Sequence, residues 1–367
     1  MQSIGTSPPP AIDEVEVSLF GPGFGECIVI HLGNSDWIIV DSCRDLDSKR
    51  PVALEYLASL GVDVERSVRR IVATHWHDDH IDGLSEVFRT ARSSSFVCTT
   101  AFQRDEFKSL LQNYFGTAAG VAGSGIDELH GIFVEVRNRQ KAGMLPTLVL
   151  AGANTIVWER VVGLPASVRA LSPSAHDVLV GLARIHSEQF FRPNAKRRRL
   201  PTLHPNNVSV VLSVRVGDAL ILLGADLQES GDNQRGWRAI VGQWNPDAGL
   251  HEYFKVPHHG SSNAHYQPVW TQMLVKQPEV TLTPFRQMLP TNADKMRIRN
   301  LAGRASISAA RRKRRYRVLD PAVQRVVNGM TRQIWRYPPN SGHIRCRRMI
   351  ASGSTWRCDL FGAAESL

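Results

Sequence analysis

The chain has 367 residues, of which 43% are hydrophobic and 21% charged, and its formal net charge at pH 7 is +10. This length is enough for one large hydrophobic core or two smaller ones. No apolar run reaches the roughly 18 residues of a membrane-spanning helix, and the N-terminus has neither the basic start nor the apolar stretch of a secretory signal. We therefore expect a cytoplasmic protein that has no membrane partner.

The chain begins with an expected disordered leader at residues 1–13, which contains three consecutive prolines. The apolar runs VEVSLF, CIVIHLG and DWIIVDS follow, separated by turn residues, as is typical of an antiparallel meander. The pattern then predicts helices at 51–62, 82–91, 103–115, 173–191, 233–244 and 267–276. It predicts strands at 68–74, 94–100, 252–256 and 279–285, and a hairpin at 208–227. This order predicts an α/β protein with two mixed sheets back to back, each covered by helices.

The five cysteines are scattered and odd in number. This usage fits a reducing cytoplasm better than a disulfide framework. We expect all five to be small, buried, apolar residues.

The positive charge is concentrated late in the chain. Residues 286–348 contain 17 Lys and Arg against two acidic residues, so this segment carries +15 and the remainder about −5. The densest basic runs are Lys196, Arg197, Arg198 and Arg199, and Arg311, Arg312, Lys313, Arg314 and Arg315. A solvated surface would explain such runs, but arginines bind phosphates well and Tyr316 can stack on a base. We expect a nucleic-acid partner, DNA, that contacts these nine residues.

The stretch IVATHWHDDHIDG, residues 71–83, follows the end of a predicted buried strand. His75 and His77 are two positions apart, so their side chains share one side of an extended segment. Asp79 and His80 follow on the turn into the next helix. Imidazole nitrogens and carboxylate oxygens suit zinc, manganese or iron, so the stretch predicts a metal site.

This stretch resembles the HxHxDH signature of the metallo-β-lactamase fold, and Gly83 follows where that family usually has glycine. LLGADL (222–227) and KVPHHGSS (255–262) resemble the later motifs of the same family. GFGECIVI, IIVDS and HPNNVSVVL resemble motifs of one branch, the hydrolase domain of the DNA-uptake competence protein ComEC and its stand-alone relatives. Where that branch commonly has GHP, this chain reads PFRQMLPTNADK.

The resemblance implies a four-layer αββα sandwich at residues 14–285, followed by a basic C-terminal extension at 286–367. It also implies two divalent metal ions, zinc or manganese, with magnesium as another option. The implied metal ligands are His75, His77, Asp79, His80, Asn206, Asp226 and His259. Asp226 would bridge the two ions.

Two of these assignments have rivals. His204 competes with Asn206, which would otherwise start a hairpin as a turn residue, and His258 competes with His259. Around the ions, Asp41 would orient a metal ligand.

Two ions about 3.5–4 Å apart lower the pKa of a shared water and hold the leaving oxygen. Asp79 would accept a proton or only bind metal, and His258 would donate a proton to the leaving group or orient a phosphate. The leading hypothesis is therefore a metal-dependent phosphodiesterase, a nuclease acting on DNA. The alternatives are a hydrolase of a small phosphorylated or ester substrate, and an effector subunit of a bacterial defence complex that its protein partners activate.

Overall fold

The computed structural model describes residues 8–22, 24–103, 125–144, 147–190, 205–286, 288–309, 341–351 and 353–367. Within them the backbone forms two eight-stranded mixed sheets. The first sheet has the order β15-β14-β1-β2-β3-β4-β5-β6 and the second has the order β16-β13-β12-β11-β10-β9-β8-β7.

In chain order, the strands of the first sheet are β1 (Glu14–Gly21), β2 (Cys27–Leu32), β3 (Trp37–Val40), β4 (Val68–Val72), β5 (Ser95–Thr99), β6 (Leu148–Ala151), β14 (Gly342–Met349) and β15 (Arg357–Gly362). Those of the second sheet are β7 (Ile156–Arg160), β8 (Ala166–Ala170), β9 (Leu212–Val216), β10 (Ala219–Leu223), β11 (His251–Lys255), β12 (Leu274–Leu282), β13 (Arg304–Ile307) and β16 (Glu365–Ser366).

The α-helices are α1 (Val52–Ser59), α2 (Val64–Ser67), α3 (Asp78–Ile81), α4 (Leu84–Thr90), α6 (Gly125–Lys141), α7 (Ala175–Phe190), α8 (Gly236–Gln243), α9 (Gln267–Gln272) and α10 (Asn292–Leu301). Short 3₁₀ turns include η1 (Thr100–Gln103), η2 (Pro205–Val208), η3 (Pro246–Ala248), η4 (His258–Gly260) and η5 (Ser262–Ala264). The predicted helix at 103–115 lies almost entirely outside the described residues. Helix α9 ends earlier than predicted, because β12 already begins at Leu274.

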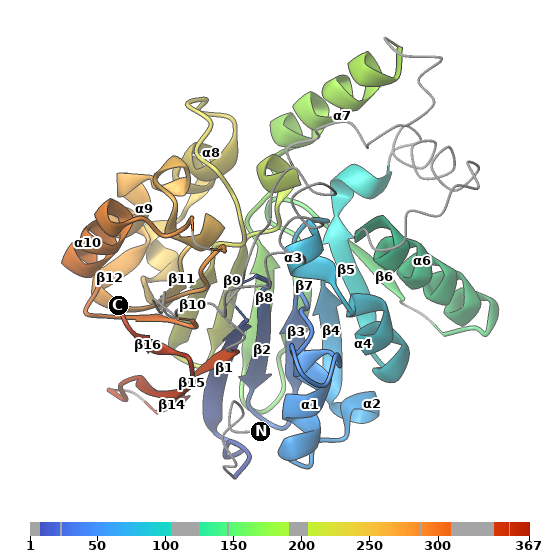
Figure 1. Cartoon of the computed structure of the whole chain (residues 1–367), viewed down its shortest axis with the longest axis horizontal. Helices are drawn as coiled ribbons and strands as arrows, with labels where there is room; N and C mark the ends of the chain where they lie inside the picture. Colours follow the sequence, from blue (N-terminus) through green and yellow to red (C-terminus); the bar gives the residue numbers. More distant parts are fainter. Residues whose placement is uncertain are drawn as a thin grey trace, which may run out of the picture.

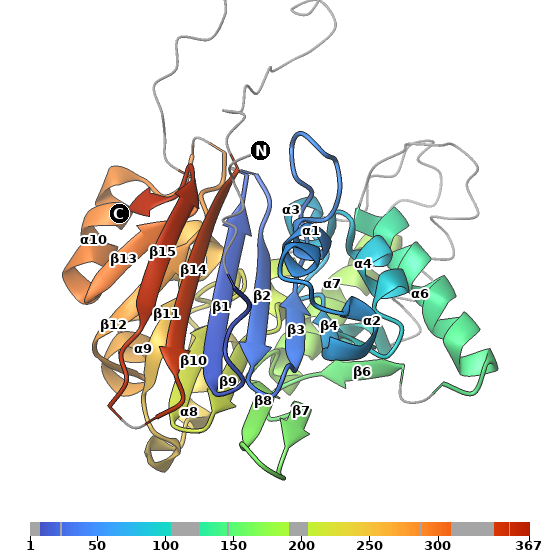
Figure 2. The same ribbon diagram turned by 90° about the horizontal axis from the view of Figure 1, so that it is seen from below.

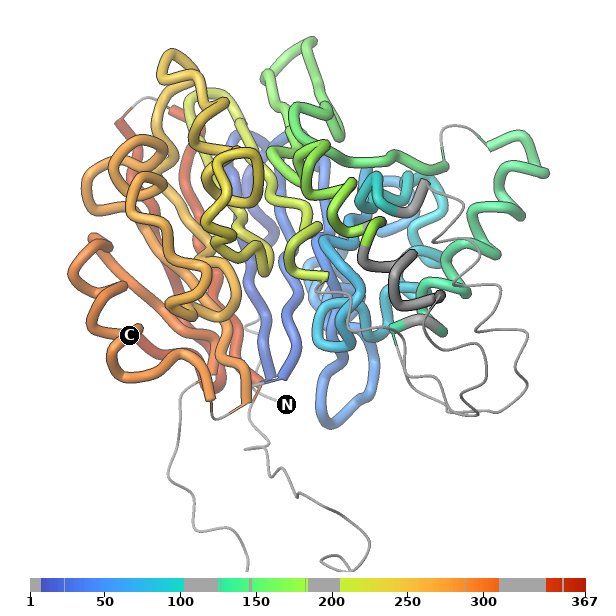
Figure 3. The backbone as a smooth tube through the Cα atoms, turned by 90° about the horizontal axis from the view of Figure 1, so that it is seen from above, coloured from blue at the N-terminus to red at the C-terminus, as the bar shows by residue number. Residues whose placement is uncertain are grey.

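The helices cover the two outer faces of the paired sheets. Figure 1 shows α8, α9 and α10 beside the second sheet, and α1, α4 and α6 on the opposite side. Seen from above, the blue strands lie between the orange segments on one side and the cyan and green segments on the other (Figure 3). The expected α/β four-layer sandwich, with helices outside two sheets, is confirmed.

Strand β1 shows why this arrangement follows from the sequence. All eight of its residues are buried, because both faces of its sheet are covered. Val15, Val17 and Leu19 pack between the two sheets, while Phe20 packs in the core under the helices. Each fully buried side chain of this size contributes about 1.5–3 kcal/mol to folding, so the period-two alternation is strongly specified.

The C-terminal strands complete both sheets. β14 pairs with β1 along its whole length and β15 pairs with β14, while β13 joins β12 in the second sheet. Figure 2 shows the red strands lying directly beside the blue β1. The sheets therefore continue across the boundary that we expected at residue 285, and the segment is more regular than its basic composition indicated.

Cys346 and Cys358 face each other on β14 and β15 and form a disulfide. The expectation that all five cysteines are unpaired is wrong for these two, because hairpin pairing brings together residues that are 12 apart in sequence. Cys27, Cys43 and Cys98 are buried and free, as expected. Among the described residues, no helix has both the length and the apolar character to cross a membrane.

Candidate metal centre

The candidate site lies at the carboxyl ends of four central strands. Strands β3 and β4 run parallel in the first sheet, and β10 and β11 run parallel in the second. Asp41 follows β3, the histidine loop follows β4, Asp226 follows β10 and the His258–His259 turn follows β11. Parallel strands end at the same edge of a sheet, so the topology gathers side chains that are far apart in the chain.

His75 and His77 form one part of the site. His75 is buried, His77 is half-buried, and His75 Nε2 lies 3.1 Å from His77 Nδ1. Nitrogen ligands of one tetrahedral zinc ion, each about 2.0–2.1 Å from the metal, are separated by about 3.3 Å. The two atoms are therefore placed as two ligands of one ion would be.

Asp79, His80, His259 and Asp226 form the adjoining part, and all four side chains are buried. His259 Nε2 lies 3.4 Å from Asp79 Oδ2 and 3.5 Å from Asp226 Oδ2. His80 Nε2 lies 3.5 Å from Asp226 Oδ1. Asp226 thus directs one oxygen to each of the two imidazoles, and the ring centroids of His80 and His75 are 4.3 Å apart, which joins the two parts into one cluster.

Several buried atoms of this cluster have no hydrogen-bond partner. They are His80 Nε2, His259 Nε2 and Asp226 Oδ1, and the buried Oδ1 of Asn206 in η2 also has none. A buried polar atom without a partner costs about 1–3 kcal/mol, and such groups normally have a stated reason. These donor atoms are also the types that bind zinc and manganese, so the described residues fit a divalent cation.

The charges at the cluster also favour a cation. Burial raises the pKa of Asp226, but the positive charges of His80 and His259 outweigh this effect and hold the pKa well below its ordinary value. Burial lowers the pKa of His259, but the carboxylates of Asp226 and Asp79 outweigh burial and raise the pKa to about 9. When protons are the only cations present, protonated imidazoles therefore balance the buried carboxylates. A divalent ion can take over this role.

Asp41 contacts His80 directly and His75 through Thr74. Its Oδ2 accepts hydrogen bonds from His80 Nδ1 at 2.8 Å and from Thr74 Oγ1 at 2.7 Å. Because the single hydroxyl hydrogen of Thr74 goes to Asp41, the contact of 3.0 Å between Thr74 Oγ1 and His75 Nδ1 must be donated by the imidazole. Both rings then present an unprotonated Nε2 to the cluster in their neutral forms.

The site loops are held in an uncommon backbone conformation. Asp41, Ala225, His258 and His259 all have positive φ angles, between 46° and 59°. Such conformations cost of the order of 1 kcal/mol or more and are enriched at functional sites. Gly224 precedes this strained turn because a Cβ atom there would lie 2.9 Å from the carbonyl oxygen of Lys255.

His258 lies beside the cluster and is half-buried. Its Nδ1 is 2.8 Å from Asn263 Oδ1, which can only accept, so Nδ1 carries the hydrogen. Burial lowers its pKa, so the ring is neutral at pH 7. Of the two rivals for the last ligand, His259 rather than His258 points its free nitrogen at Asp79 and Asp226.

Asn206 is buried in η2, and the segment after it reaches the histidine loop, since Val210 N–H donates to Thr74 O at 3.0 Å. Its rival His204 lies outside the described residues, so the choice between them stays a prediction. Where the expected GHP is missing, the ring of Phe285 packs on His259 with a centroid distance of 5.2 Å.

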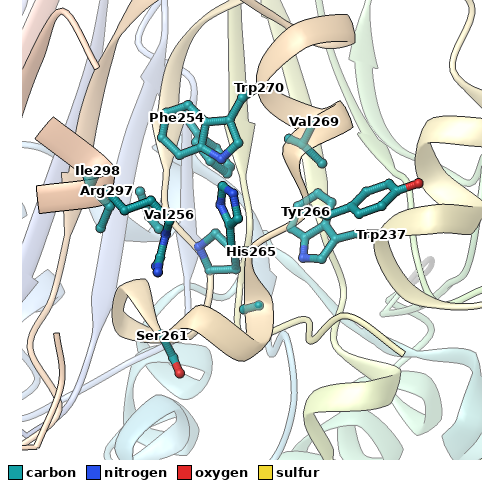
Figure 4. A pocket seen from close by; sticks show the side chains of 12 residues that line it. Trp237, Phe254, Val256, Ser261, His265, Tyr266, Val269, Trp270, Arg297 and Ile298 are labelled. Carbon is teal, nitrogen blue, oxygen red and sulfur yellow. The ribbon is translucent and has the colours of Figure 1, made fainter. Parts of the chain in front are cut away.

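The loop that carries His258 and His259 rests on an aromatic pocket. Trp237, Tyr266 and Trp270 line this pocket together with His265 and Arg297, as Figure 4 shows. Arg297 Nη2 donates to the carbonyl oxygen of Gly260 at 2.7 Å, and its Nη1 bonds Asp294 at 2.7 Å. The contact from Arg297 holds the backbone of the loop at Gly260.

The nine basic residues expected to bind nucleic acid lie outside the described residues. Five other arginines of the basic segment have internal carboxylate partners: Arg297 with Asp294, Arg304 with Glu279, Arg345 with Asp359, Arg347 with Glu16, and Arg348 with Asp218. Part of the +15 charge is therefore neutralised within the fold.

Sequence reasoning missed four polar residues next to the cluster: Thr74, Thr283, Glu26 and Lys255. The sequence does contain a signal for Glu26 and Lys255. Glu26 directly precedes the apolar run CIVI, and Lys255 ends the apolar strand β11. A charged residue in such a place is almost never fully buried unless it has a partner.

A comparison with protein families found a match for part of the chain. Residues 20–105 match the family model described as the metallo-beta-lactamase superfamily. The match includes Asp41 and the His75–His80 loop. This part of the chain is therefore similar to that superfamily. The match and the candidate metal-binding residues together indicate a metal-dependent hydrolase.

No curated protein matches the chain. Among solved structures, it is similar to the metallo-beta-lactamase fold protein YhfI from Bacillus subtilis, with a TM-score of 0.40 and 10% identity over 81% of this chain and 96% of that chain. It is also similar to a Cronobacter sakazakii metallo-beta-lactamase with a HARLDQ motif, with a TM-score of 0.34 and 15% identity over 68% and 78% of the two chains. A metallo-beta-lactamase from Hirschia baltica gives a TM-score of 0.27 and 10% identity over 61% and 73%.

Proposed function

We propose that the chain is a phosphodiesterase that uses two divalent metal ions, zinc or manganese, and that its substrate is DNA. The observation that carries this proposal is the paired arrangement of ligand atoms. His75 and His77 face each other on one side, and Asp79, His80 and His259 converge on the other. Asp226, with one oxygen toward each imidazole of the second group, is the proposed bridge.

In this proposal, His75 and His77 would hold one ion with Asn206 or His204, and Asp79, His80 and His259 would hold the other. Bound divalent ions supply Lewis acidity and lower the pKa of a water molecule toward neutrality. Asp41 and Thr74 accept the Nδ1 hydrogens of His80 and His75, so the neutral form of each ring offers Nε2 to an ion. Asp79 is buried with an ionised carboxylate, because nearby His80 and His259 overcome the burial that raises its pKa and hold that pKa far below its usual range.

His258 has a more restricted role than its position in the sequence indicated. A neutral ring whose Nδ1–H is bonded to Asn263 has only Nε2 left for a substrate. We therefore propose that it accepts a hydrogen bond or a proton at Nε2 and orients the substrate. Protonated, the same ring could return that proton to a leaving oxygen.

The DNA assignment is supported by the two basic runs of the sequence, and by the likeness of the motifs to the hydrolase domain of a DNA-uptake protein. A small phosphorylated or ester substrate is the second candidate, since one fold hosts many substrates. Activation by protein partners in a defence complex would be compatible with either substrate.

The test is hydrolysis of plasmid DNA, linear DNA and bis-p-nitrophenyl phosphate by the wild type in Mn²⁺, Zn²⁺ and Mg²⁺. His77→Ala and Asp226→Ala should lose about 100-fold or more of the wild-type rate, because several kcal/mol of transition-state stabilisation disappear with the metal. Metal content is measured on the same samples. Turnover of the small ester that DNA does not compete for would favour the second candidate. No hydrolysis by the wild type in any metal, with or without its genomic neighbours, would contradict the proposal.

A further inference from the structure

Glu26 and Lys255 form an ion pair in which both side chains are almost completely buried, with exposures of 1% and 0%. Glu26 lies in the loop between β1 and β2 of the first sheet, and Lys255 is the last residue of β11 in the second. Burying two charges is expensive, and an ion pair often repays less than the loss of hydration. Its presence beside a candidate metal site therefore calls for a reason other than stability.

The pair contacts the loops of three proposed metal ligands. The Glu26 backbone N–H donates to the carbonyl oxygen of Asp79 at 2.8 Å. Lys255 Nζ donates to the carbonyl oxygen of Ala225, next to Asp226, at 3.1 Å. The pair is connected to the third loop, which carries His259, through the hydroxyl of Thr283.

Thr283 connects Glu26 to His259. Thr283 Oγ1 donates its only hydrogen to Glu26 Oε2 at 2.5 Å. The contact of 3.0 Å between Thr283 Oγ1 and His259 Nδ1 must then be donated by the imidazole. In the neutral ring this places the hydrogen on Nδ1 and leaves Nε2 unprotonated toward Asp79 and Asp226.

The same arrangement occurs on the other side of the site. There Asp41 accepts from Thr74, and Thr74 accepts from His75 Nδ1. Each hydrogen-bond chain leads from a carboxylate through a threonine to an imidazole, and the Nε2 atom of that imidazole faces the cluster. The two carboxylates differ in their further partners, because Glu26 is paired with the buried Lys255, whereas Asp41 also accepts from His80.

We propose that Glu26, Lys255 and Thr283 are positioning residues for the metal centre. They set the tautomer of His259 and hold the Asp79 and Asp226 loops at the separation that one ion requires. This inference rests on the proposed metal site and adds to it three residues that do not touch the metal. Without the Glu26 carboxylate, Thr283 can turn its hydrogen toward His259 Nδ1, which favours the tautomer that cannot bind metal through Nε2.

The test measures metal affinity of the full chain by competition with a chromogenic chelator for Zn²⁺ and Mn²⁺. Glu26→Gln and Thr283→Val should each weaken binding by about tenfold or more, as outer partners of metal ligands typically do. Thr283→Ser keeps the hydroxyl and should restore most of the affinity lost in Thr283→Val.

Glu16→Gln is the matched control. Glu16 is also buried and pairs with an arginine, Arg347, at 2.7 Å, but its other partners are Ser18 and Tyr56 rather than residues of the site. It should lower the midpoint of urea unfolding and leave metal affinity unchanged. If Glu26→Gln does not fold, Thr283→Val and Thr283→Ser, which leave both charges in place, still decide the question.

Wild-type affinity in both Glu26→Gln and Thr283→Val would overturn the inference while leaving the metal site intact. An equal loss of affinity in Glu16→Gln would also overturn it, by showing that general destabilisation is enough. A wild-type protein that binds neither ion would overturn the proposed function and this inference together.

Discussion

Asp41 Oδ2 accepts a hydrogen bond from His80 Nδ1 at 2.8 Å, although the two residues are 39 positions apart in the chain. Asp41 directly follows β3, and His80 lies in α3, after the neighbouring strand β4. The same carboxylate oxygen also accepts from Thr74, which in turn accepts from His75, so one side chain is linked to two histidines.

Asp41→Asn should weaken metal binding about 10–100-fold, because Asp41 accepts hydrogen bonds at both oxygens, whereas an amide is uncharged and has an NH2 donor in place of one oxygen. Chelator competition measures the change. The matched control is Asp36→Asn, since Asp36 is also buried but pairs with Arg69 and Arg160. The control should reduce stability alone, and an equal loss of affinity in both variants would contradict the assignment.

Metal affinity should depend on pH. The pKa of His259, raised to about 9 by Asp226 and Asp79 against the opposing effect of burial, means that an ion must displace a proton from this ring below pH 9. The apparent affinity should therefore rise with pH between about 6.5 and 9, by about tenfold per pH unit for each proton displaced. Titrations at several pH values, and proton release into weak buffer, measure this. A flat profile would contradict the displacement of protons.

Stability should fall on acidification, and His251, like His31, is one source of this dependence. It is buried, its Nδ1 donates to Met273 O at 2.8 Å, and burial lowers its pKa from 6.5 to about 4. The unfolded chain takes up a proton below about 6.5 that the folded chain takes up only near 4. The stabilisation is thus complete above pH 6.5 and is lost as the pH falls to 4, at about 1.4 kcal/mol per pH unit.

His251→Asn, whose amide can still donate to Met273, should therefore flatten the dependence of the unfolding free energy on pH between 4 and 6.5. Urea titrations at three pH values in this window measure the slope. An unchanged slope in the His251 variant would show that another group is responsible.

Reduction of the Cys346–Cys358 disulfide should lower the free energy of unfolding by about 2–3 kcal/mol, as expected for a crosslink across 12 residues. Urea unfolding with and without a phosphine reductant measures the difference. The double variant Cys346→Ser, Cys358→Ser should not respond to the reductant. Alkylation of the denatured, unreduced protein should label three cysteines, and labelling of all five would contradict the crosslink.

DNA binding, if it follows the proposed function, should depend on the second basic run. The measured quantity is the slope of the logarithm of the DNA-binding constant against the logarithm of the salt concentration. Changing Arg311, Arg312, Lys313, Arg314 and Arg315 to glutamine should make this slope less steep by up to about 4.5. The control changes Arg137 and Lys141, two exposed residues of α6, to glutamine. Equal slopes in the two variants would mean that charge outside the run is just as effective.

The part of the site that could be predicted is the part that is continuous in sequence. His75, His77, Asp79 and His80 lie within six positions, so their spacing alone indicates a metal site. Asp226 and His259 became visible only through resemblance, because each is a single residue in a short loop. The Thr283–Glu26 hydrogen bond spans 257 positions, and no local pattern indicates such a contact.

The fold was predictable where apolar runs alternate with turns and helices, as in β1 to β3. The fold was not predictable in β14, where the run that contains Arg345, Arg347 and Arg348 has the charge pattern of a solvent-exposed segment. These side chains are buried because carboxylates from other strands and turns neutralise them. Charge patterns in a single sequence indicate exposure, and only the tertiary structure provides the partners.

The pairing of β14 with β1 also affects how the protein is made. On the ribosome, the edge of β1 that pairs with β14 keeps its unpaired backbone groups until residues 342–349 have emerged. An open strand edge is a template for pairing with other chains. The nascent polypeptide therefore passes through a long period in which β1 is available for aggregation, and this period ends only when β14 pairs with it.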